Sequence, residues 1–254
     1  MSKITASDLA WEKYGQSNPY FGVFTDEIFK TSNLTDDILK TFFESGKEHV
    51  NHLMNVLNWL AKEQPKFKTI LDFGCGTGRL VIPFSAIAER VVGIDVSPSM
   101  LNEAEKNLKR LGIDNVNLIQ SNSLESLEGK KFDLVHTFIV LQHIPVSSGY
   151  GLIKSLLDVI NPGGYAMIHL TYSNDKSAFK NIKYHLRSRY KLFAQFYNLI
   201  KGKNPNAPSM QMNNYSLNHI FRMIDKAGIN SFYSELTNHA GFRGVNLYLR
   251  KEQS

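Results

Sequence analysis

The stretch Leu71-Asp72-Phe73-Gly74-Cys75-Gly76-Thr77-Gly78-Arg79 decides the fold of this chain of 254 residues. It follows a short apolar run that predicts a strand, and it precedes a segment with helical spacing. Glycines in such a turn let the backbone approach a ligand closely, and the start of the next helix presents free N–H groups. A dinucleotide fingerprint would place its third glycine at 79, where Arg stands. The pattern therefore predicts a nucleotide-like ligand that is not held as a dinucleotide.

Short apolar runs alternate with amphipathic stretches on the carboxyl side of this turn. The runs predict strands at 69–73, 90–95, 116–119, 132–139 and 165–170, and the stretches between them predict helices at 79–88, 99–111 and 151–160. Ser97 and Pro98 mark the start of the second helix, and Gly112 marks its end. Strand and helix in strict alternation predict an α/β fold with a parallel sheet and helices on both faces.

The two ends of the chain have other patterns. Near the carboxyl end, a helix is predicted at 216–227, followed by strands at 229–236 and 245–249 that a short loop joins. Strands so closely joined can pair antiparallel, because a parallel crossover needs a dozen or more residues. Near the amino end, 34–61 has helical spacing behind the N-cap Thr35, whereas 1–33 is expected to be an irregular arm.

The composition excludes several classes of protein. With 43% hydrophobic and 20% charged residues, the chain can form one sizeable core. A single cysteine, Cys75, cannot form an intramolecular disulfide, and no apolar run reaches the roughly 20 residues of a membrane helix. We therefore expect a cytoplasmic protein. His49 and His52 have no third ligand near in sequence, so we expect a solvated helix face and no metal site.

The positive charge is concentrated in an insert after the fifth strand. The whole chain has a formal charge of +6, but 172–215 contains eight basic residues and one acid, or +7, which leaves −1 for the remainder. Within 179–200, apolar residues recur at helical spacing beside a basic stripe of lysines and arginines. The insert is interpreted as a helical lid with a solvated back, or as a surface for RNA, another polyanion or an anionic membrane.

Four motifs in order resemble those of the class I S-adenosylmethionine-dependent methyltransferases. They are the glycine turn at 71–79, the strand end at 91–97, the pair of segments 132–135 and 141–144, and Asn161-Pro162-Gly163-Gly164 before the fifth strand. The resemblance covers roughly 65–170 together with the closing helix and two strands. It implies a Rossmann-like sheet of seven strands with an antiparallel last strand, and a transferase that uses S-adenosyl-L-methionine. The arm and helix at 1–64 would then cap the active site of a methyltransferase domain at 65–254.

The resemblance also implies the residues that bind the cofactor. Asp95 would accept hydrogen bonds from both ribose hydroxyls, although a turn acid that caps the next helix is the alternative. Asn122 stands where the family often has an Asp for the adenine amino group, and it can accept the same bond without the charge. Arg79 would pair with the methionine carboxylate or lie at the surface. The full set is Asp72, Gly74, Cys75, Gly76, Gly78, Arg79, Asp95, Val96, Met100, Asn122, Ser123 and Phe138.

Acceptor chemistry is indicated by two histidines. Methyl transfer to a hydroxyl needs a group that removes the proton, and His143 after the fourth strand and His239 in the last loop are the candidates. The arm and the insert lie where related enzymes enclose their acceptor, which favours O-methylation of a small molecule such as a sugar or a secondary metabolite. An RNA or polyanion methyltransferase and a non-catalytic cofactor-binding protein are the alternatives. The sequence leaves the oligomeric state open.

Overall fold

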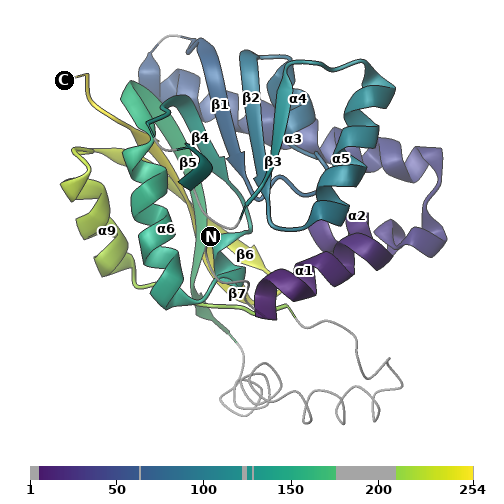
Figure 1. Ribbon diagram of the computed structural model, residues 1–254. Coiled ribbons are helices and arrows are strands. Elements are labelled where there is room, and N and C mark those ends of the chain that lie inside the picture. Colours follow the sequence, from purple (N-terminus) through teal and green to yellow (C-terminus); the bar gives the residue numbers. More distant parts are fainter. Residues whose placement is uncertain (1–5, 63, 122–124, 128, 176–209, 254) are drawn as a thin grey trace.

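A computed structural model describes residues 6–62, 64–121, 125–127, 129–175 and 210–253 (Figure 1). Its centre is a seven-stranded sheet with the strand order β3-β2-β1-β4-β5-β7-β6. The strands are β1 (Phe67–Phe73), β2 (Ala88–Asp95), β3 (Val116–Gln120), β4 (Phe132–Thr137), β5 (Ile160–Asn174), β6 (Phe232–His239) and β7 (Phe242–Arg250). Strands β1 to β5 pair in parallel, and β7 runs antiparallel to both of its neighbours. The predicted sheet is confirmed.

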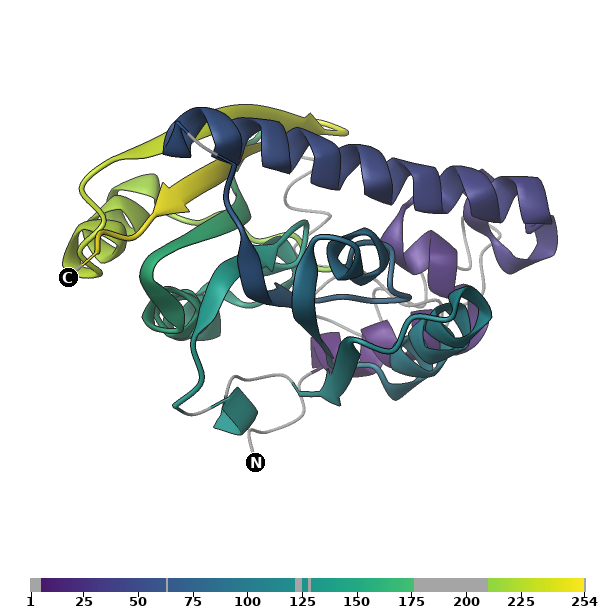
Figure 2. The same ribbon diagram turned by 90° about the horizontal axis from the view of Figure 1, so that it is seen from above.

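Helices cover both faces of the sheet (Figure 2). Before β1 come α1 (Ala6–Ser17), α2 (Pro19–Val23), the 3-10 turns η1 (Glu27–Phe29) and η2 (Thr31–Asn33), and α3 (Asp36–Ala61). The others are α4 (Val81–Ser85), α5 (Pro98–Leu111), η3 (Glu125–Leu127), η4 (Leu141–His143), α6 (Val146–Asp158) and α9 (Leu217–Lys226). Because side chains alternate along a strand, Ile70 packs with the core under α3 and Leu71 with the core under α6 and α9.

Short-range capping signals place the ends of two helices. The Thr35 side chain accepts a hydrogen bond from the Ile38 N–H at the start of α3, as its position predicts. The Ser97 hydroxyl accepts from the Met100 N–H at the start of α5, where Pro98 occupies the first turn. Gly112 ends α5 in the left-handed conformation, with φ of 66°.

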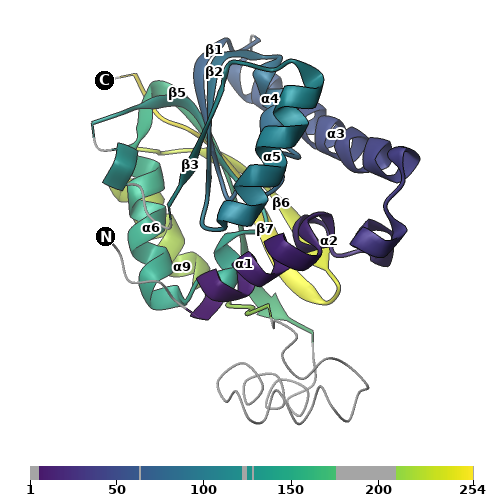
Figure 3. The same ribbon diagram turned by 45° about the vertical axis from the view of Figure 1, so that its right-hand side comes forward.

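Three sequence predictions about local structure are wrong. The helix predicted at 79–88 is only the five residues of α4, because β2 already begins at Ala88, which pairs with Phe67. The loop predicted at 237–244 is a two-residue turn, since Ala240 and Gly241 both have positive φ and let β6 and β7 continue up to it. The arm expected to be irregular at 1–33 forms α1 and α2, which lie beside α5 (Figure 3).

The insert that the sequence predicts at 172–215 begins later in the structure. Strand β5 continues to Asn174, which pairs with Phe242 of β7, so the first residues of the predicted insert belong to the sheet. Residues 176–209, which include the predicted lid helix and its basic stripe, lie outside the described residues.

Candidate active site

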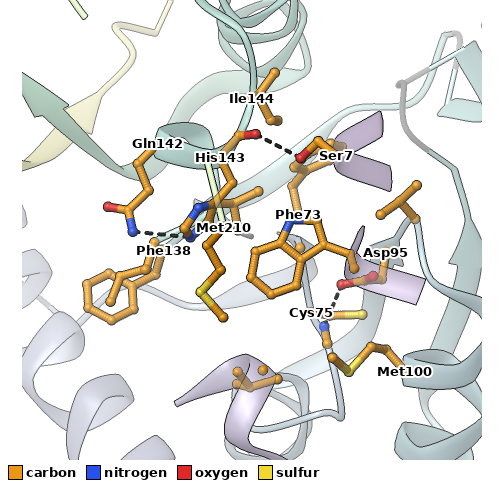
Figure 4. A pocket seen from close by; sticks show the side chains of 18 of the residues that line it. Ser7, Phe73, Cys75, Asp95, Met100, Phe138, Gln142, His143, Ile144 and Met210 are labelled. Carbon is orange, nitrogen blue, oxygen red and sulfur yellow. Dashed lines mark hydrogen bonds between the residues drawn. The ribbon is translucent and has the colours of Figure 1, made fainter. Parts of the chain in front are cut away.

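A cavity of about 770 Å³ lies at the carboxyl ends of β1, β2 and β4. This is the edge at which open parallel sheets bind ligands, and the volume is in the range of small-molecule sites. Its walls come from the glycine turn, the ends of the strands, the N-terminal helices, η4 and the β6–β7 hairpin, as Figure 4 illustrates for some of the lining side chains. Segments far apart in the sequence therefore contribute to one cavity.

The glycine turn brings backbone to the floor of the cavity. Gly74, Gly76 and Gly78 have φ values of 84°, 53° and 92°, a region that side chains other than hydrogen disfavour. A Cβ atom on Gly74 would lie 2.2 Å from a methyl carbon of Val140, so this position also lacks room for a side chain. Gly74 and Gly76 line the cavity, whereas Gly78 does not.

Asp95 ends β2 and is held by two backbone donors. Its Oδ2 accepts from the Gly76 N–H and its Oδ1 accepts from the Ser97 N–H, both at 2.9 Å (Figure 4). Burial raises the pKa of this carboxyl from 3.8 to about 6, although the backbone hydrogen bonds act in the opposite direction. The carboxylate is thus preorganised, and it gains most from a ligand that donates further hydrogen bonds.

A buried carboxylate and a buried guanidinium lie on the glycine-turn side. Asp72 and Arg79 are 2% and 6% exposed, so the surface alternative for Arg79 is wrong. The Asp72 Oδ2 and Arg79 Nε atoms are buried and have no hydrogen-bond partner in the described part of the chain. The guanidinium lies 5.8 Å and 5.9 Å from the ring centres of Phe24 and Phe138, and burial lowers its pKa to about 10. The site therefore offers one negative and one positive group to a ligand.

Cys75 is buried within the same turn. Burial, followed by the charge of Asp95, raises the pKa of the Cys75 thiol well above its ordinary value, which disfavours the reactive thiolate. Its role is that of a small lining residue. Val96, from the β2–α5 connection, and Met100, from the first turn of α5, add apolar surface beside Asp95.

Helix α1 closes the cavity over Asp95 and η4. The Glu12 carboxylate accepts from the Ser97 hydroxyl at 2.7 Å and from the Ser99 hydroxyl at 2.6 Å, and these bonds fix α1 to the start of α5. The Ser7 hydroxyl donates to the His143 carbonyl at 3.0 Å, and the Trp11 ring packs edge-on against the His143 ring at 4.9 Å. Ser7 and Trp11 line the cavity.

The two candidate histidines have different surroundings. The His143 Nδ1 lies 2.6 Å from the Gln211 carbonyl, which only accepts, and its Nε2 lies 3.2 Å from the Gln142 amide nitrogen (Figure 4). His239 lines the cavity at the end of β6, not in a loop, and its Nε2 has no partner among the described residues. Burial lowers the pKa of His143 to about 4 and lowers that of His239 as well, so both rings are neutral near pH 7.

A family model described as "Methyltransferase domain" matches residues 70–164, the segment that contains this glycine turn and Asp95. This segment of the chain is therefore similar to a methyltransferase domain, in agreement with the motifs of the S-adenosylmethionine-dependent methyltransferases.

Two curated proteins are similar to part of this chain. It is 33% identical over 124 residues to the chloroplastic magnesium protoporphyrin IX methyltransferase of Arabidopsis thaliana, covering 48% of this chain and 39% of that protein. It is 30% identical over 144 residues to a ubiquinone biosynthesis O-methyltransferase of Coxiella burnetii, covering 55% and 58%. The chain thus spans about half the length of these curated relatives.

Two solved structures share the fold of this chain over almost its whole length. Magnesium protoporphyrin IX methyltransferase from Synechocystis PCC 6803, solved with bound SAH, aligns with a TM-score of 0.59 at 17% identity, covering 95% of this chain and 98% of that chain. An N-methyltransferase from Bradyrhizobium japonicum WM9, in complex with S-adenosyl-L-homocysteine, aligns with a TM-score of 0.61 at 12% identity, covering 97% and 99%.

The structure brings together most of the site residues that the sequence predicts. The cavity is lined by Asp72, Gly74, Cys75, Gly76, Arg79, Asp95, Val96, Met100, Phe138, His143 and His239. Asn122 and Ser123 lie outside the described residues. Sequence reasoning missed Ser7, Glu12 and Gln142. The capping pattern Ser97-Pro98-Ser99 could have indicated a carboxylate partner, but nothing local indicates Glu12.

His49 does not lie on a solvated helix face as predicted. Its ring is partly buried and its Nε2 lies 3.0 Å from the Nε2 of His136, a buried residue of β4. In the described residues, no three His, Cys, Asp or Glu side chains are grouped so that they could hold a metal ion. Within the same part of the chain, the helices lack the combined length and apolar character that crossing a membrane requires.

Proposed function

We propose that this protein transfers the methyl group of S-adenosyl-L-methionine to a hydroxyl of a small molecule. The observation that carries the proposal is the pair of oppositely charged groups in the cavity wall. Asp72 is paired with His136 and not with Arg79, and both Asp72 and Arg79 keep an unpartnered buried atom within the described part of the chain. An α-amino acid group, with its ammonium and carboxylate, satisfies both at once.

The other end of the cofactor fits the opposite part of the cavity. The Asp95 carboxylate is held by Gly76 and Ser97 and has lone pairs left for the two ribose hydroxyls. Val96 and Met100 supply the apolar surface that an adenine ring requires. When bound, S-adenosyl-L-methionine supplies a methyl group on a positively charged sulfur. The two solved structures that share the fold contain SAH, which is the form of the cofactor that remains after methyl transfer, and this supports the same assignment.

An apolar acceptor side favours a small, largely uncharged acceptor. Trp11, Phe138, Met210 and Met212 line the cavity together with the neutral rings of His143 and His239. Helix α1 covers this side and excludes water, which favours a displacement between aligned groups. The relatives whose names refer to protoporphyrin and to ubiquinone biosynthesis agree with an organic acceptor.

His239 is the better candidate for the proton acceptor. The Gln211 carbonyl requires a proton on His143 Nδ1, and the Gln142 amide then occupies the lone pair of His143 Nε2. The Nε2 of His239 has no such partner among the described residues. In the proposed step this atom takes the hydroxyl proton, the acceptor oxygen bonds to the methyl carbon, and the electron pair of the broken S–C bond remains on sulfur.

Calorimetry with S-adenosylhomocysteine tests the cofactor site. We expect a Kd in the micromolar range, and Asp95→Ala should raise it about tenfold or more, because the loss of a charged hydrogen-bond acceptor costs roughly 1.5 to 3 kcal/mol. Asp114→Ala, which removes an exposed carboxylate, is the matched control and should leave Kd unchanged. An unaltered affinity in Asp95→Ala would contradict the proposal.

A transfer assay tests the reaction. The protein is incubated with methyl-labelled S-adenosylmethionine and fractionated small-molecule extracts, and label in an ether product is measured. We expect His239→Asn to reduce the rate by roughly 100-fold, the lower range for general base catalysis, with little change in cofactor Kd. Exposed His219→Asn is the control. Tight cofactor binding without any transfer would instead favour a non-catalytic binding protein.

A further inference from the structure

A hydrogen-bonded network of three side chains, His49, His136 and Asp72, leads from helix α3 to the cavity wall. Asp72 and His136 occupy paired positions on the neighbouring parallel strands β1 and β4, so their side chains lie on the same face of the sheet. The His136 Nδ1 lies 2.8 Å from the Asp72 Oδ1, and the His136 Nε2 lies 3.0 Å from the His49 Nε2. His136 and Asp72 are 0% and 2% exposed. The network is therefore shielded from water.

Each hydrogen bond of this network has a defined donor and a defined acceptor. A carboxylate only accepts, so the His136 Nδ1 carries the proton that binds Asp72. The Nε2 of a neutral His136 is then a lone pair, and the His49 Nε2 must donate to it. Burial and the neighbouring His136 hold the pKa of His49 well below its ordinary value, which keeps His49 a neutral donor. The second oxygen of Asp72, Oδ2, is buried and has no hydrogen-bond partner among the described residues.

Packing alone does not explain these polar groups. The ring centres of His136 and Phe84 lie 5.1 Å apart, and those of His49 and Phe138 lie 4.3 Å apart. Apolar side chains could make the same packing contacts. Burying polar groups is unfavourable unless each finds a partner, and here the partners form a line that ends on a residue of the cavity.

We propose that His136 and His49 are positioning residues that hold the Asp72 carboxylate in the orientation in which it faces the ammonium group of the bound ligand. The inference rests on the proposed function, because it takes the ligand to be an α-amino acid derivative. Without the His136 donor, the Asp72 carboxylate loses one bond and one constraint on its orientation, and its grip on the ammonium weakens.

The test compares two ligands that differ at the amino acid end. Calorimetry is run with S-adenosylhomocysteine and with methylthioadenosine, which has the same nucleoside and thioether but no ammonium or carboxylate. His136→Leu should weaken S-adenosylhomocysteine about tenfold and leave methylthioadenosine unchanged. His136→Asn, whose amide nitrogen can replace Nδ1 as a donor, should remain within about threefold of the wild type for both ligands.

Further variants keep the test informative if His136→Leu does not fold. His49→Phe removes the outer donor but keeps an aromatic ring against Phe138, and it should weaken S-adenosylhomocysteine alone, by about threefold. His169→Leu removes another buried histidine, one whose hydrogen bond goes to Thr237, and is the matched control for both ligands. The ring nitrogen shifts of His136 in NMR spectra should report a proton on Nδ1 in the wild type.

The outcomes separate the inference from the proposed function. If the wild type binds neither ligand, the proposed function and this inference both fail. If the wild type binds S-adenosylhomocysteine but His136→Leu and His49→Phe bind it equally well, only the inference fails. An equal loss for both ligands would also overturn it, because that pattern indicates a structural role alone.

Discussion

The raised pKa of Asp95 predicts that the ligand-free protein becomes less stable as the pH rises. The pKa of the Asp95 carboxyl is about 6 in the folded protein, whereas its ordinary value, taken for the unfolded chain, is 3.8. Between these two pH values the folded state therefore binds more protons than the unfolded state. The stabilisation from the protonated form is complete below the unfolded pKa and is lost as the pH rises through about 6. Two units of pKa correspond to about 3 kcal/mol. Asp95→Asn cannot ionise and should lack this part of the pH dependence.

Urea denaturation of the ligand-free protein from pH 3.5 to pH 7 measures this effect. The unfolding free energy of Asp95→Asn minus that of the wild type should rise by about 3 kcal/mol over the range. The absolute value at any one pH also includes the bond that Asn cannot accept from Gly76 or Ser97, so the slope is decisive. A difference that stays constant with pH would refute the reasoning. S-adenosylhomocysteine should bind the wild type more weakly below pH 6.

Three further substitutions follow from the geometry. Arg79→Met should weaken S-adenosylhomocysteine about tenfold in calorimetry but leave methylthioadenosine unchanged, since only the first ligand has a carboxylate for the buried guanidinium. Gly74→Ala should cost more than about 2 kcal/mol in urea denaturation, because its positive φ adds to the overlap with Val140, whereas Gly112→Ala, with positive φ and open space, should cost about 1 kcal/mol. Glu12→Gln should lower the free energy of unfolding in urea denaturation by about 1 kcal/mol, because it removes the negative charge that accepts from the Ser99 N–H at the start of α5.

The part of the cavity wall that the glycine turn and Asp95 form could be predicted because these residues follow short-range patterns. The glycine turn lies within nine consecutive residues, and Asp95 stands at the end of the next strand, a position that the alternation of strand and helix fixes. Strands β1 and β2 are neighbours in the sheet, which brings Asp95 to the Gly76 N–H. The position of these residues at one edge of the sheet follows from the sequence, and their role in binding a ligand stays a prediction.

The rest of the site depends on contacts that leave no local signal. His49 and His136 lie 87 residues apart and meet because α3 packs on the sheet beside β4. Helix α1 has little apolar periodicity, and its contacts with α5 include polar and small groups: Glu12 accepts from the Ser97 hydroxyl, and a Cβ atom on Gly15 would lie 2.6 Å from the same hydroxyl oxygen. Pattern reading therefore assigned α1 to an irregular arm.

The buried charges connect the stability of this protein to its ligand. Asp72, Arg79 and Asp95 all line one cavity, and burial shifts the pKa of Arg79 and Asp95 toward their neutral forms, so the ligand-free fold contains groups that water would solvate better. A ligand with an ammonium, a carboxylate and two ribose hydroxyls replaces the lost solvation at each of them. The largest contributions to the binding free energy should therefore come from the same three buried side chains that destabilise the ligand-free fold. A saturating ligand should raise the midpoint of thermal unfolding. Because Glu12 connects α1 to the helix that follows Asp95, that gain should extend to α1.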